Sequence, residues 1–376
     1  MIRTSITIFC FFLIGCTQKK IKQQLSDNQT NLTSLRYAEG FKVSYSGNIK
    51  TVEVNYPFQG AASGYKYLLV PHTEDVPKHE PDTKIIRTPL QHIVCTSTTH
   101  IPLLDYLHET ETLTGFPGTD YISSKKMRER IDQGKIEELG IDKGINLERL
   151  AMLKPDMVMA YSMNSDYGQF KKMEELGIPV VMNAEYLEKH PLGRAEWIKF
   201  MALFFNKEKE ADSIFAVIEK NYLAAKALVP PEKRPTVMSG IVYGDAWFLP
   251  GGQNYNSRLL KDAGCQYLWE TDSSTGYLEI SFESVYNKAN QADYWIGVAN
   301  YESLEAIRNA DQRYAKFKAF AENKVYTYDA RKGDKGGSEF LELGYLRPDI
   351  ILKDLIKITH PDILPDYELF FYKELE

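Results

Sequence analysis

The sequence predicts an α/β fold of two lobes, each a mainly parallel sheet flanked by helices, joined by one long spanning helix and preceded by a small β-rich extension. Short apolar strands alternate with helical segments over residues 92–184, and the alternation restarts at residue 236, which is the pattern of parallel sheets. The intervening segment 191–229 has no strand pattern. The chain of 376 residues, 43% of them hydrophobic, also exceeds what one core usually supports.

The N-terminus has the features of an export signal. Arg3 precedes an apolar run over residues 6–14, which is too short to span a bilayer and is typical of a signal-peptide core. The run ends in LIGC at 13–16, which resembles the lipobox of bacterial lipoproteins, where cleavage leaves the cysteine as the lipidated first residue. We therefore expect residues 1–15 to be a signal peptide and Cys16 to hold the protein at the periplasmic face of a bacterial membrane, through lipid only.

The segments that follow are expected to be a tether and a β-rich extension. Residues 16–35 are polar and nearly free of large apolar side chains, which is the composition of a flexible tether. Three β-rich segments, FKVSYSG, KTVEVNYPF and YKYLLV, are separated by turn residues and predict a small antiparallel extension. The Pro-rich stretch after them indicates a connector, so that extension and connector together occupy residues 36–88.

The N-terminal lobe is expected over residues 89–205. Asn146 is the expected N-cap of its second helix, and Pro155 ends that helix. The apolar pattern places strands at 92–97, 111–116, 156–161 and 178–184, and helices at 100–109, 146–153 and 167–177.

A spanning helix is expected over residues 206–230. The segment 191–229 indicates two helices broken around Asn206, and in the second helix apolar residues recur at helical spacing. At 1.5 Å per residue, residues 207–229 make a rod of roughly 33 Å. An ordinary amphipathic surface helix explains the apolar stripe equally well, and only its place between two α/β patterns favours the connector.

The C-terminal lobe is expected over residues 231–376. The apolar pattern places its strands at 236–244, 292–299 and 324–330, and its helices at 256–264, 281–289 and 348–358. Outside the leader and the lipid site, the only cysteines of the sequence are Cys95 and Cys265. Both are expected to be small buried apolar residues rather than a disulfide pair.

One run of residues carries a family resemblance. Residues 146–158, NLERLAMLKPDMV, combine a cap, an acid, a proline and an apolar strand in one register, and LGIPVV follows at 176–181. The chain resembles the iron-siderophore, heme and cobalamin class of periplasmic solute-binding proteins, whose two lobes are joined by one long helix. The resemblance covers about residues 89–360.

The resemblance implies a monomer without a cofactor that serves an ABC importer. Such a protein binds an iron complex, either a ferric siderophore or heme, between its lobes and delivers it to the membrane permease. A corrinoid such as cobalamin is the alternative ligand within the same class.

The resemblance also implies two docking positions, because in this family an acidic residue on the outer face of each lobe pairs with arginines of the permease. Glu148 matches the position in the N-terminal lobe, although an acid there also stabilises the helix dipole in any protein. The C-terminal counterpart is expected near Gln253, where a neutral side chain replaces the acid. Either docking is asymmetric, or another acid such as Asp262 serves, or the alignment is displaced by a few residues.

The ligand is expected at the carboxyl ends of the strands, where two-lobed α/β proteins bind their ligands. Aromatic side chains with a hydroxyl or an indole N–H suit the wide faces of planar chelates and macrocycles, and a guanidinium suits an anionic ligand. The loop 333–342 belongs to the same expected site. The ligand-binding candidates are Ser97, Thr98, Thr99, His100, Tyr121, Tyr161, Asn164, Tyr243, Trp247, Phe248 and Arg331.

Other functions agree less well with the sequence. The seven histidines form no HxH pair or His-rich loop, so a bare metal ion is not the expected ligand, and direct coordination by His100 has no support. The sequence has no GxSxG, Walker A, HExxH or CxxC pattern, which argues against an enzyme. A net charge of −6 without a block of Lys and Arg argues against nucleic acid. A periplasmic enzyme on the same scaffold and a purely structural surface lipoprotein remain as alternatives.

Overall fold

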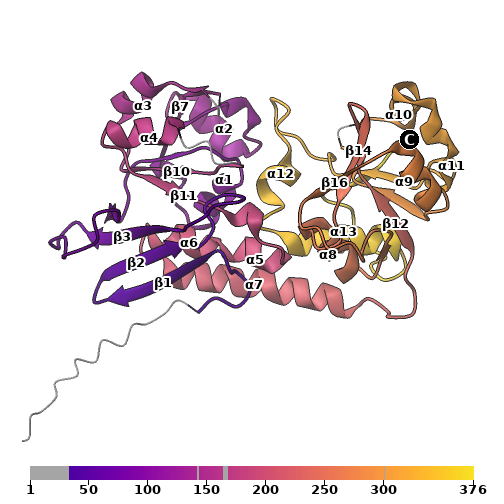
Figure 1. Cartoon of the computed structure of the whole chain (residues 1–376), viewed down its shortest axis with the longest axis horizontal. Helices are drawn as coiled ribbons and strands as arrows, with labels where there is room; N and C mark the ends of the chain where they lie inside the picture. Colours follow the sequence, from indigo (N-terminus) through magenta and orange to yellow (C-terminus); the bar gives the residue numbers. More distant parts are fainter. Residues whose placement is uncertain (1–33, 142–143, 164–167, 300) are drawn as a thin grey trace, which may run out of the picture.

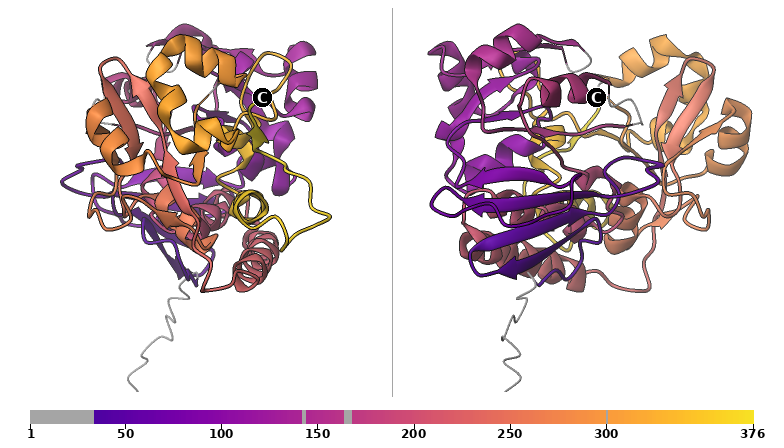
Figure 2. Two further views of the ribbon diagram at one scale, coloured as in Figure 1. Left: turned by 90° about the vertical axis from the view of Figure 1, so that its right-hand side faces the viewer. Right: turned by 60° about the vertical axis from the view of Figure 1, so that its left-hand side comes forward.

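The protein has two lobes above one long helix. The computed structural model describes residues 34–141, 144–163, 168–299 and 301–376. The expected signal peptide, Cys16 and Asn164 lie outside these residues. Figure 1 shows the helix α7 (Glu208–Ala227) running beneath both lobes, and the left view of Figure 2 shows α13 (Pro348–Thr359) beside it. The predicted two-lobed α/β fold with a spanning helix is confirmed.

The N-terminal lobe is built on a five-stranded parallel sheet in the order β11-β10-β5-β6-β7. Its central strands are buried on both faces, which explains why they are continuous apolar runs. The strands are β5 (Ile93–Cys95), β6 (Leu113–Phe116), β7 (Glu137–Glu138), β10 (Met157–Ala160) and β11 (Val180–Met182), and a ribbon pairs β8 (Gly140–Ile141) with β9 (Gly144–Ile145).

The helices of this lobe include one that the sequence did not predict, α2. It begins after Ser124, whose side chain accepts the N–H of Met127. The predicted cap of α3 is confirmed, because the Asn146 side chain accepts the N–H of Arg149. The helices are α1 (His100–Tyr106), α2 (Lys125–Asp132), α3 (Leu147–Leu153) and α4 (Gly168–Glu175), with short 3-10 turns at η1 (Thr110–Thr112), η2 (Thr119–Tyr121) and η3 (Glu185–Leu187).

The segment 191–229 forms three helices, where two were expected. They are α5 (Pro191–Glu196), α6 (Ile198–Leu203) and α7, and the predicted break at Asn206 is confirmed by its left-handed φ of 57°. The 20 residues of α7 span about 30 Å. This helix packs on α6 in the N-terminal half and on α13 in the C-terminal half, so it contacts both lobes.

The C-terminal lobe repeats the parallel architecture in the order β15-β12-β17-β18-β19, with only β19 antiparallel to its neighbour. The strands are β12 (Thr236–Ser239), β15 (Gln266–Tyr267), β17 (Tyr294–Ile296), β18 (Val325–Thr327) and β19 (Lys373–Glu374). The helices are α8 (Tyr255–Asp262), α9 (Phe282–Ala289), α10 (Leu304–Ala310), α11 (Lys318–Ala321), α12 (Glu339–Leu343) and α13, and a 3-10 turn, η4, covers Gln312–Lys316.

A second, antiparallel sheet of this lobe was missed. The expected strand 236–244 divides at Gly240, whose φ is +81°, so that its first half is β12 and its second half is β13 (Ile241–Tyr243) of another sheet. Strand β13 pairs with β14 (Ala246–Pro250), which pairs with β16 (Tyr277–Ile280). This correction decides where several candidate residues lie.

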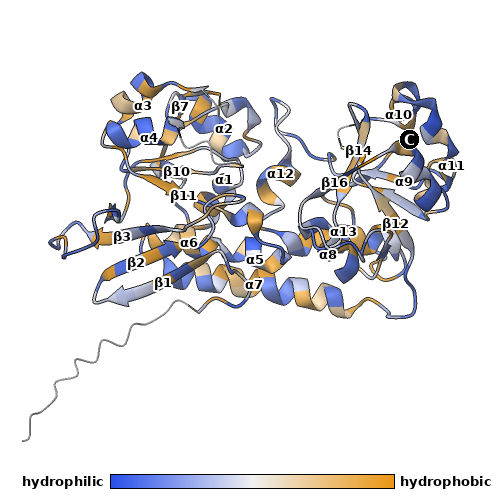
Figure 3. Ribbon diagram, viewed as in Figure 1, coloured by the Kyte–Doolittle hydropathy of each residue, from blue (hydrophilic) through white to orange (hydrophobic). Residues whose placement is uncertain are grey.

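The extension is a four-stranded sheet rather than a three-stranded antiparallel one. Its strands are β1 (Phe41–Ser46), β2 (Ile49–Val54), β3 (Tyr65–Pro71) and β4 (Lys84–Thr88), and β4, which forms within the expected connector, runs parallel to β3. The sheet shares its core with the N-terminal lobe. In Figure 3, hydrophobic residues lie on β2 of the extension and on β10, β11 and α6 of the N-terminal lobe.

Aromatic rings and a buried carboxylate attach the start of the described chain to the N-terminal lobe. The centre of the Phe41 ring lies 4.8 Å from that of Trp197 and 5.2 Å from that of Phe200. The buried carboxylate of Glu196 accepts the backbone N–H groups of Arg36, Tyr37 and Ala38 at 2.8–3.1 Å. These contacts fix the beginning of the described chain to the N-terminal lobe.

Two further observations concern the compartment. Among the described residues, no helix combines the length and the apolar character that crossing a bilayer requires. Cys95 and Cys265 are free and buried, as expected. Burial raises the pKa of the Cys265 thiol to about 12, so this thiol is not ionised near neutral pH.

Candidate ligand site between the lobes

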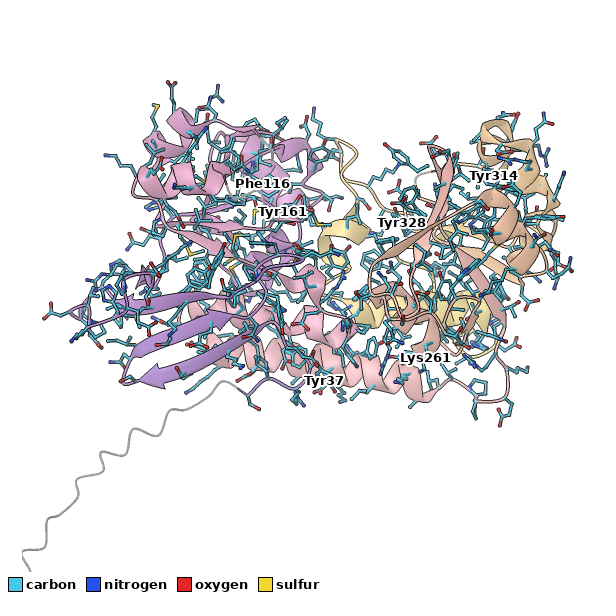
Figure 4. The ribbon with its side chains drawn as sticks, in the orientation of Figure 1. Tyr37, Phe116, Tyr161, Lys261, Tyr314 and Tyr328 are labelled. Atoms are coloured by element: carbon cyan, nitrogen blue, oxygen red, sulfur yellow. The ribbon has the colours of Figure 1, made fainter. Side chains whose placement is uncertain are left out.

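A cavity of about 450 Å³ lies between the lobes. Figure 4 labels Phe116 and Tyr161 on the N-terminal side of it and Tyr328 on the C-terminal side. The described residues that line it are Thr96, Ser97, Thr98, Phe116, Pro117, Tyr121, Tyr161, Tyr328, Asp329, Lys332, Gly336, Gly337, Ser338 and Leu341.

The N-terminal wall is formed at the carboxyl ends of three parallel strands. Thr96 follows β5, Phe116 ends β6 and Tyr161 follows β10, which is where this sheet geometry leaves a crevice. Hydrogen bonds fix the loop after β5. The Thr99 hydroxyl donates to the buried carboxyl of Glu185 at 2.5 Å and pairs with the Ser97 hydroxyl at 2.9 Å. The wall therefore presents hydroxyl groups and aromatic rings on a fixed loop.

The C-terminal wall contributes no net charge. Tyr328 and Asp329 follow β18, and the Asp329 carboxylate pairs with the Lys332 ammonium at 2.7 Å. Asp329 and Lys332 are the only Asp, Glu, Lys, Arg or His residues among the described residues that line the cavity. Burial raises the pKa of Tyr328 to about 12, so its hydroxyl is neutral. The cavity as described is polar and aromatic but electrically balanced.

The segment 333–343, which we call the interlobe clasp, belongs to the C-terminal lobe but lies against the N-terminal lobe. The buried carboxyl of Glu342 accepts the N–H groups of Ser123 and Ser124 at 2.6 and 3.0 Å. A Cβ at Gly337 would lie 2.2 Å from the backbone oxygen of Tyr121, so only glycine allows this approach. The clasp thus closes one side of the cavity.

A second bridge between the lobes lies below the clasp. The Arg347 guanidinium donates to the Tyr106 hydroxyl of α1 at 2.8 Å and is held by the buried Asp349. In addition, the Arg194 guanidinium of α5 lies 3.9 Å from the centre of the Tyr255 ring of α8. Several independent contacts therefore hold the lobes in one relative position.

Burial raises the pKa of Glu342 to about 7. The hydrogen bonds from Ser123 and Ser124 lower this pKa, but their effect is smaller than that of burial. Because this pKa exceeds the ordinary carboxyl value of 4.5, the protonated form favours the folded state. The stability that this group contributes is complete below pH 4.5 and is lost as the pH rises through 7.

We expect the substitution Glu342→Gln, which keeps the shape without the charge, to remove this loss. The free energy of unfolding of the wild type should fall relative to that of the variant between pH 5 and pH 8, measured by urea denaturation at each pH. Parallel curves for the two proteins would show that Glu342 does not titrate in this range.

A smaller chamber of about 200 Å³ adjoins the cavity inside the C-terminal lobe. It shares the side chains of Tyr328 and Leu341 with the interlobe cavity. The antiparallel sheet of β13, β14 and β16 forms one of its walls, and helices α8 and α12 contribute others.

Four of the predicted ligand residues line the interlobe cavity: Ser97, Thr98, Tyr121 and Tyr161. Thr99 and His100 do not, because Thr99 turns toward Glu185 and His100 is fully buried in α1. The expectation of a cleft histidine is therefore wrong, and the burial of His100 lowers its pKa to about 3. Asn164 lies outside the described residues.

The expected position of Trp247 is wrong. The chain turns at Gly244 and returns as β14, so Trp247 lies within a strand and opposite Val242. Its indole is fully buried, donates to the Ser239 carbonyl oxygen at 3.0 Å and packs 5.6 Å from the ring of Tyr314, which Figure 4 labels.

The remaining candidates of this lobe also lie outside the interlobe cavity. Phe248, on the opposite face of β14 from Trp247, lines the adjoining chamber. Tyr243 is 79% exposed at the hairpin. Arg331 is exposed, donates to the Glu339 carboxylate at 2.6 Å and lies over the Phe370 ring.

Sequence reasoning missed Phe116, Pro117, Tyr328 and Asp329 as cavity residues. The signal was present, because all four stand at or just after the ends of β6 and β18, where the strand-end rule applies. Within the described residues, no group of three or more His, Cys, Asp or Glu side chains is placed to hold a metal ion.

The two predicted docking residues lie on different sides of the molecule. Glu148 is exposed in the first turn of α3, at the upper edge in Figure 1. Gln253 instead lines a third cavity of about 770 Å³ together with Tyr37 and Lys261, which Figure 4 labels at the lower edge near α7. Asp262 is buried and pairs with the Lys226 ammonium, so it is not an exposed acid.

Helices α3 and α9 repeat one local unit. In each, a polar side chain caps the helix, with Asn146 accepting an N–H in α3 and Ser281 in α9. In each, a glutamate is the second helical residue, Glu148 in α3 and Glu283 in α9. Glu283 is 73% exposed and pairs with the Arg313 guanidinium at 3.1 Å, and it occupies in α9 the position that Glu148 occupies in α3.

The repeat continues into the sheets. Asp156, just before β10, accepts the N–H of His92 next to β5 at 2.8 Å. Asp293, just before β17, accepts the N–H of Thr236 at the start of β12 at 2.9 Å. In both lobes the helix thus leads, through an aspartate, into a strand parallel to the one that the aspartate holds.

Comparison with known proteins gives matches over most of the chain. Residues 93–332 match the family model described as periplasmic binding protein. An uncharacterized lipoprotein of Methanocaldococcus jannaschii is 27% identical, covering 94% of this chain and 88% of its own length. A second uncharacterized lipoprotein of that organism is 26% identical, covering 96% and 91%.

Solved structures share the fold at low identity. A periplasmic heme-binding protein of Vibrio cholerae has a TM-score of 0.56 and 17% identity, covering 71% of this chain and 99% of its own. A possible iron-binding solute-binding protein of Staphylococcus epidermidis has a TM-score of 0.56 and 18% identity, covering 73% and 100%. A nickel-bound protein of Helicobacter pylori has a TM-score of 0.58 and 18% identity, covering 75% and 88%.

Proposed function

The chain belongs to the periplasmic binding protein family, and we propose that it is the substrate-binding lipoprotein of an ABC importer for an iron complex. The complex, a ferric siderophore or heme, binds in the cavity between the lobes and is delivered to the permease. The single observation that carries this proposal is the interlobe cavity lined by Phe116, Tyr121, Tyr161 and Tyr328, because large metal chelates present apolar surface that packs against aromatic rings. The family is one of solute-binding proteins, so the chain is not an enzyme.

The charge balance of the cavity narrows the proposal. Its described lining has one ion pair, between Asp329 and Lys332, and Arg331 points away to Glu339. A multiply anionic chelate would lose hydration there without gaining a cationic partner. A neutral complex, such as iron held by three hydroxamates, fits better than a catecholate complex or the propionates of heme. A corrinoid with an amide edge is the second candidate for the same reason.

Membrane attachment and docking complete the proposal. Cys16 is the proposed lipid site, and the lipoprotein names of two relatives support it. Glu148 and Glu283 are the proposed docking acids, supported by their equivalent positions in the repeat of α3 and α9. Gln253 is withdrawn from this role because it lies at the α7 side of the molecule.

The ligand class can be tested with a panel of complexes and the mature chain. We expect a neutral ferric tris-hydroxamate to raise the melting temperature by a few degrees, because a ligand at 100 times its Kd stabilises by about 2.7 kcal/mol. Ferric catecholate and heme should give smaller shifts. A response to cobalamin alone would assign the second candidate, and no shift with any member of the panel would contradict the proposal.

A further inference from the structure

The chamber beside the interlobe cavity has no role in the function proposed so far. Its described lining contains no Asp, Glu, Lys, Arg or His side chain. Aliphatic side chains contribute from several directions, among them Ile241, Leu259, Leu260 and Leu355. The interlobe cavity, by contrast, is lined by hydroxyls and an ion pair. The two spaces therefore suit different chemistry.

Two polar side chains of the chamber are already paired within the protein, and three further hydroxyls in its described lining belong to Tyr328, Tyr345 and Tyr372. The Ser239 hydroxyl donates to the Ile296 carbonyl oxygen at 2.7 Å, and the Asn256 side-chain amide donates to the Tyr277 hydroxyl at 3.3 Å. A polar occupant would have to compete with these bonds. An uncharged, mainly apolar occupant would gain the contacts of the aliphatic and aromatic side chains without desolvating a charged group, which favours its entry.

The chamber adjoins the ligand site, with two residues in common. Tyr328 and Leu341 line both spaces, and Leu341 belongs to α12 within the interlobe clasp. The end of β18 and the clasp thus form the boundary that the two spaces share. A cavity of about 150 Å³ with apolar walls is known to hold benzene, so about 200 Å³ accommodates one aromatic ring or a branched aliphatic group.

We propose that this chamber is a subsite for an uncharged aromatic or branched aliphatic arm of the ligand whose iron chelate lies in the interlobe cavity. The inference rests on the proposed function, since it assumes a chelate between the lobes. It adds a requirement on the ligand: a neutral polar body and at least one apolar arm. Burial of one ring in such a chamber corresponds to roughly a 10- to 100-fold gain in affinity.

Two ferric complexes that differ only in the arm provide the test. Iron with three acetohydroxamates has methyl groups, and iron with three benzohydroxamates has phenyl rings on the same neutral chelate. We expect the mature chain to bind the phenyl complex roughly 10- to 100-fold more tightly in calorimetric titration. Equal affinities would overturn the subsite.

A filling substitution identifies the chamber as the source of the preference. Ile241→Trp places an indole in it from β13, at a position that is only half-buried, so the sheet should tolerate the change. The matched control is Tyr243→Trp, two residues along the same strand but exposed and outside the chamber. Ile241→Trp should abolish the preference and Tyr243→Trp should retain it. A preference that survives in Ile241→Trp would overturn the proposal.

Toluene separates failure of the subsite from failure of the iron function. In the ligand-free protein, NMR should detect toluene in the wild type and in Tyr243→Trp but not in Ile241→Trp. If neither iron complex binds while toluene still does so, the apolar subsite stands and the iron ligand is wrong. If toluene does not bind the wild type, the subsite is wrong whatever the iron complexes do.

Discussion

Replacing Glu342 with alanine should destabilise the protein by about 2–4 kcal/mol, because it leaves two buried N–H groups without an acceptor. These are the N–H groups of Ser123 and Ser124, which the carboxyl accepts at 2.6 and 3.0 Å across the gap between the lobes. The interlobe clasp should then separate from the N-terminal lobe. Since Gly337 and Leu341 of the clasp line the cavity, ligand affinity should fall at least roughly tenfold as well.

The matched control for this experiment is Glu339→Ala, one turn earlier in α12. Glu339 pairs with Arg331 at the surface, where Arg331 is half exposed, and such pairs contribute about 0–1 kcal/mol. Urea unfolding at pH 6 compares the two variants on one scale. Equal losses of stability in the two variants would mean that the contact of Glu342 across the lobes stabilises the protein no more than a surface ion pair does.

Reversing the charge of both proposed docking acids, in the double variant Glu148→Arg and Glu283→Arg, should nearly abolish transport. Each substitution places a cation where a permease arginine is expected, and such like-charge contacts cost several kcal/mol. Together they should lower uptake by at least roughly 100-fold. Ligand affinity should stay within about twofold of the wild type, because neither residue is among those lining the interlobe cavity or the chamber.

Uptake of labelled complex into vesicles that contain the permease measures this effect, and calorimetry measures the affinity of the free protein. Glu210→Arg is the matched control, since Glu210 is also an exposed first-turn acid but belongs to α7 on the opposite side of the molecule. Unchanged transport by the double variant would contradict the docking role, and a large loss of affinity would show that these residues act on the ligand site instead.

The sequence predicted the parallel part of the fold well because burial on both faces leaves a simple pattern. Strands β10 and β17 are short apolar runs after a capped helix and an aspartate, and both were predicted. The prediction from sequence failed where the course of the chain depends on the backbone conformation of a single residue. The left-handed turn at Gly240 moves residues 241–243 to another sheet, and no change of hydrophobic period marks that turn.

The correct and incorrect strand assignments also explain which site residues were predicted. The strand-end rule found Ser97, Thr98 and Tyr161, whose strands were placed correctly. It misplaced Trp247, because the rule took the hairpin turn for the end of a strand. The clasp brings Glu342 to Ser123 across 219 positions of the chain, a tertiary contact that local patterns do not contain.

The attachment of the first described residues has a mechanical consequence. Three N–H groups at Arg36–Ala38 bond to Glu196, and the Lys199 ammonium donates to the Ser34 carbonyl oxygen. The same segment is also held to the spanning helix α7, because the Tyr37 hydroxyl donates to the Glu219 carboxylate at 2.8 Å and the Arg36 guanidinium pairs with that carboxylate at 2.6 Å. A pull applied to the chain at Ser34 would therefore load α5, α6 and α7 together, so drag on the tether would reach the helix that both lobes share.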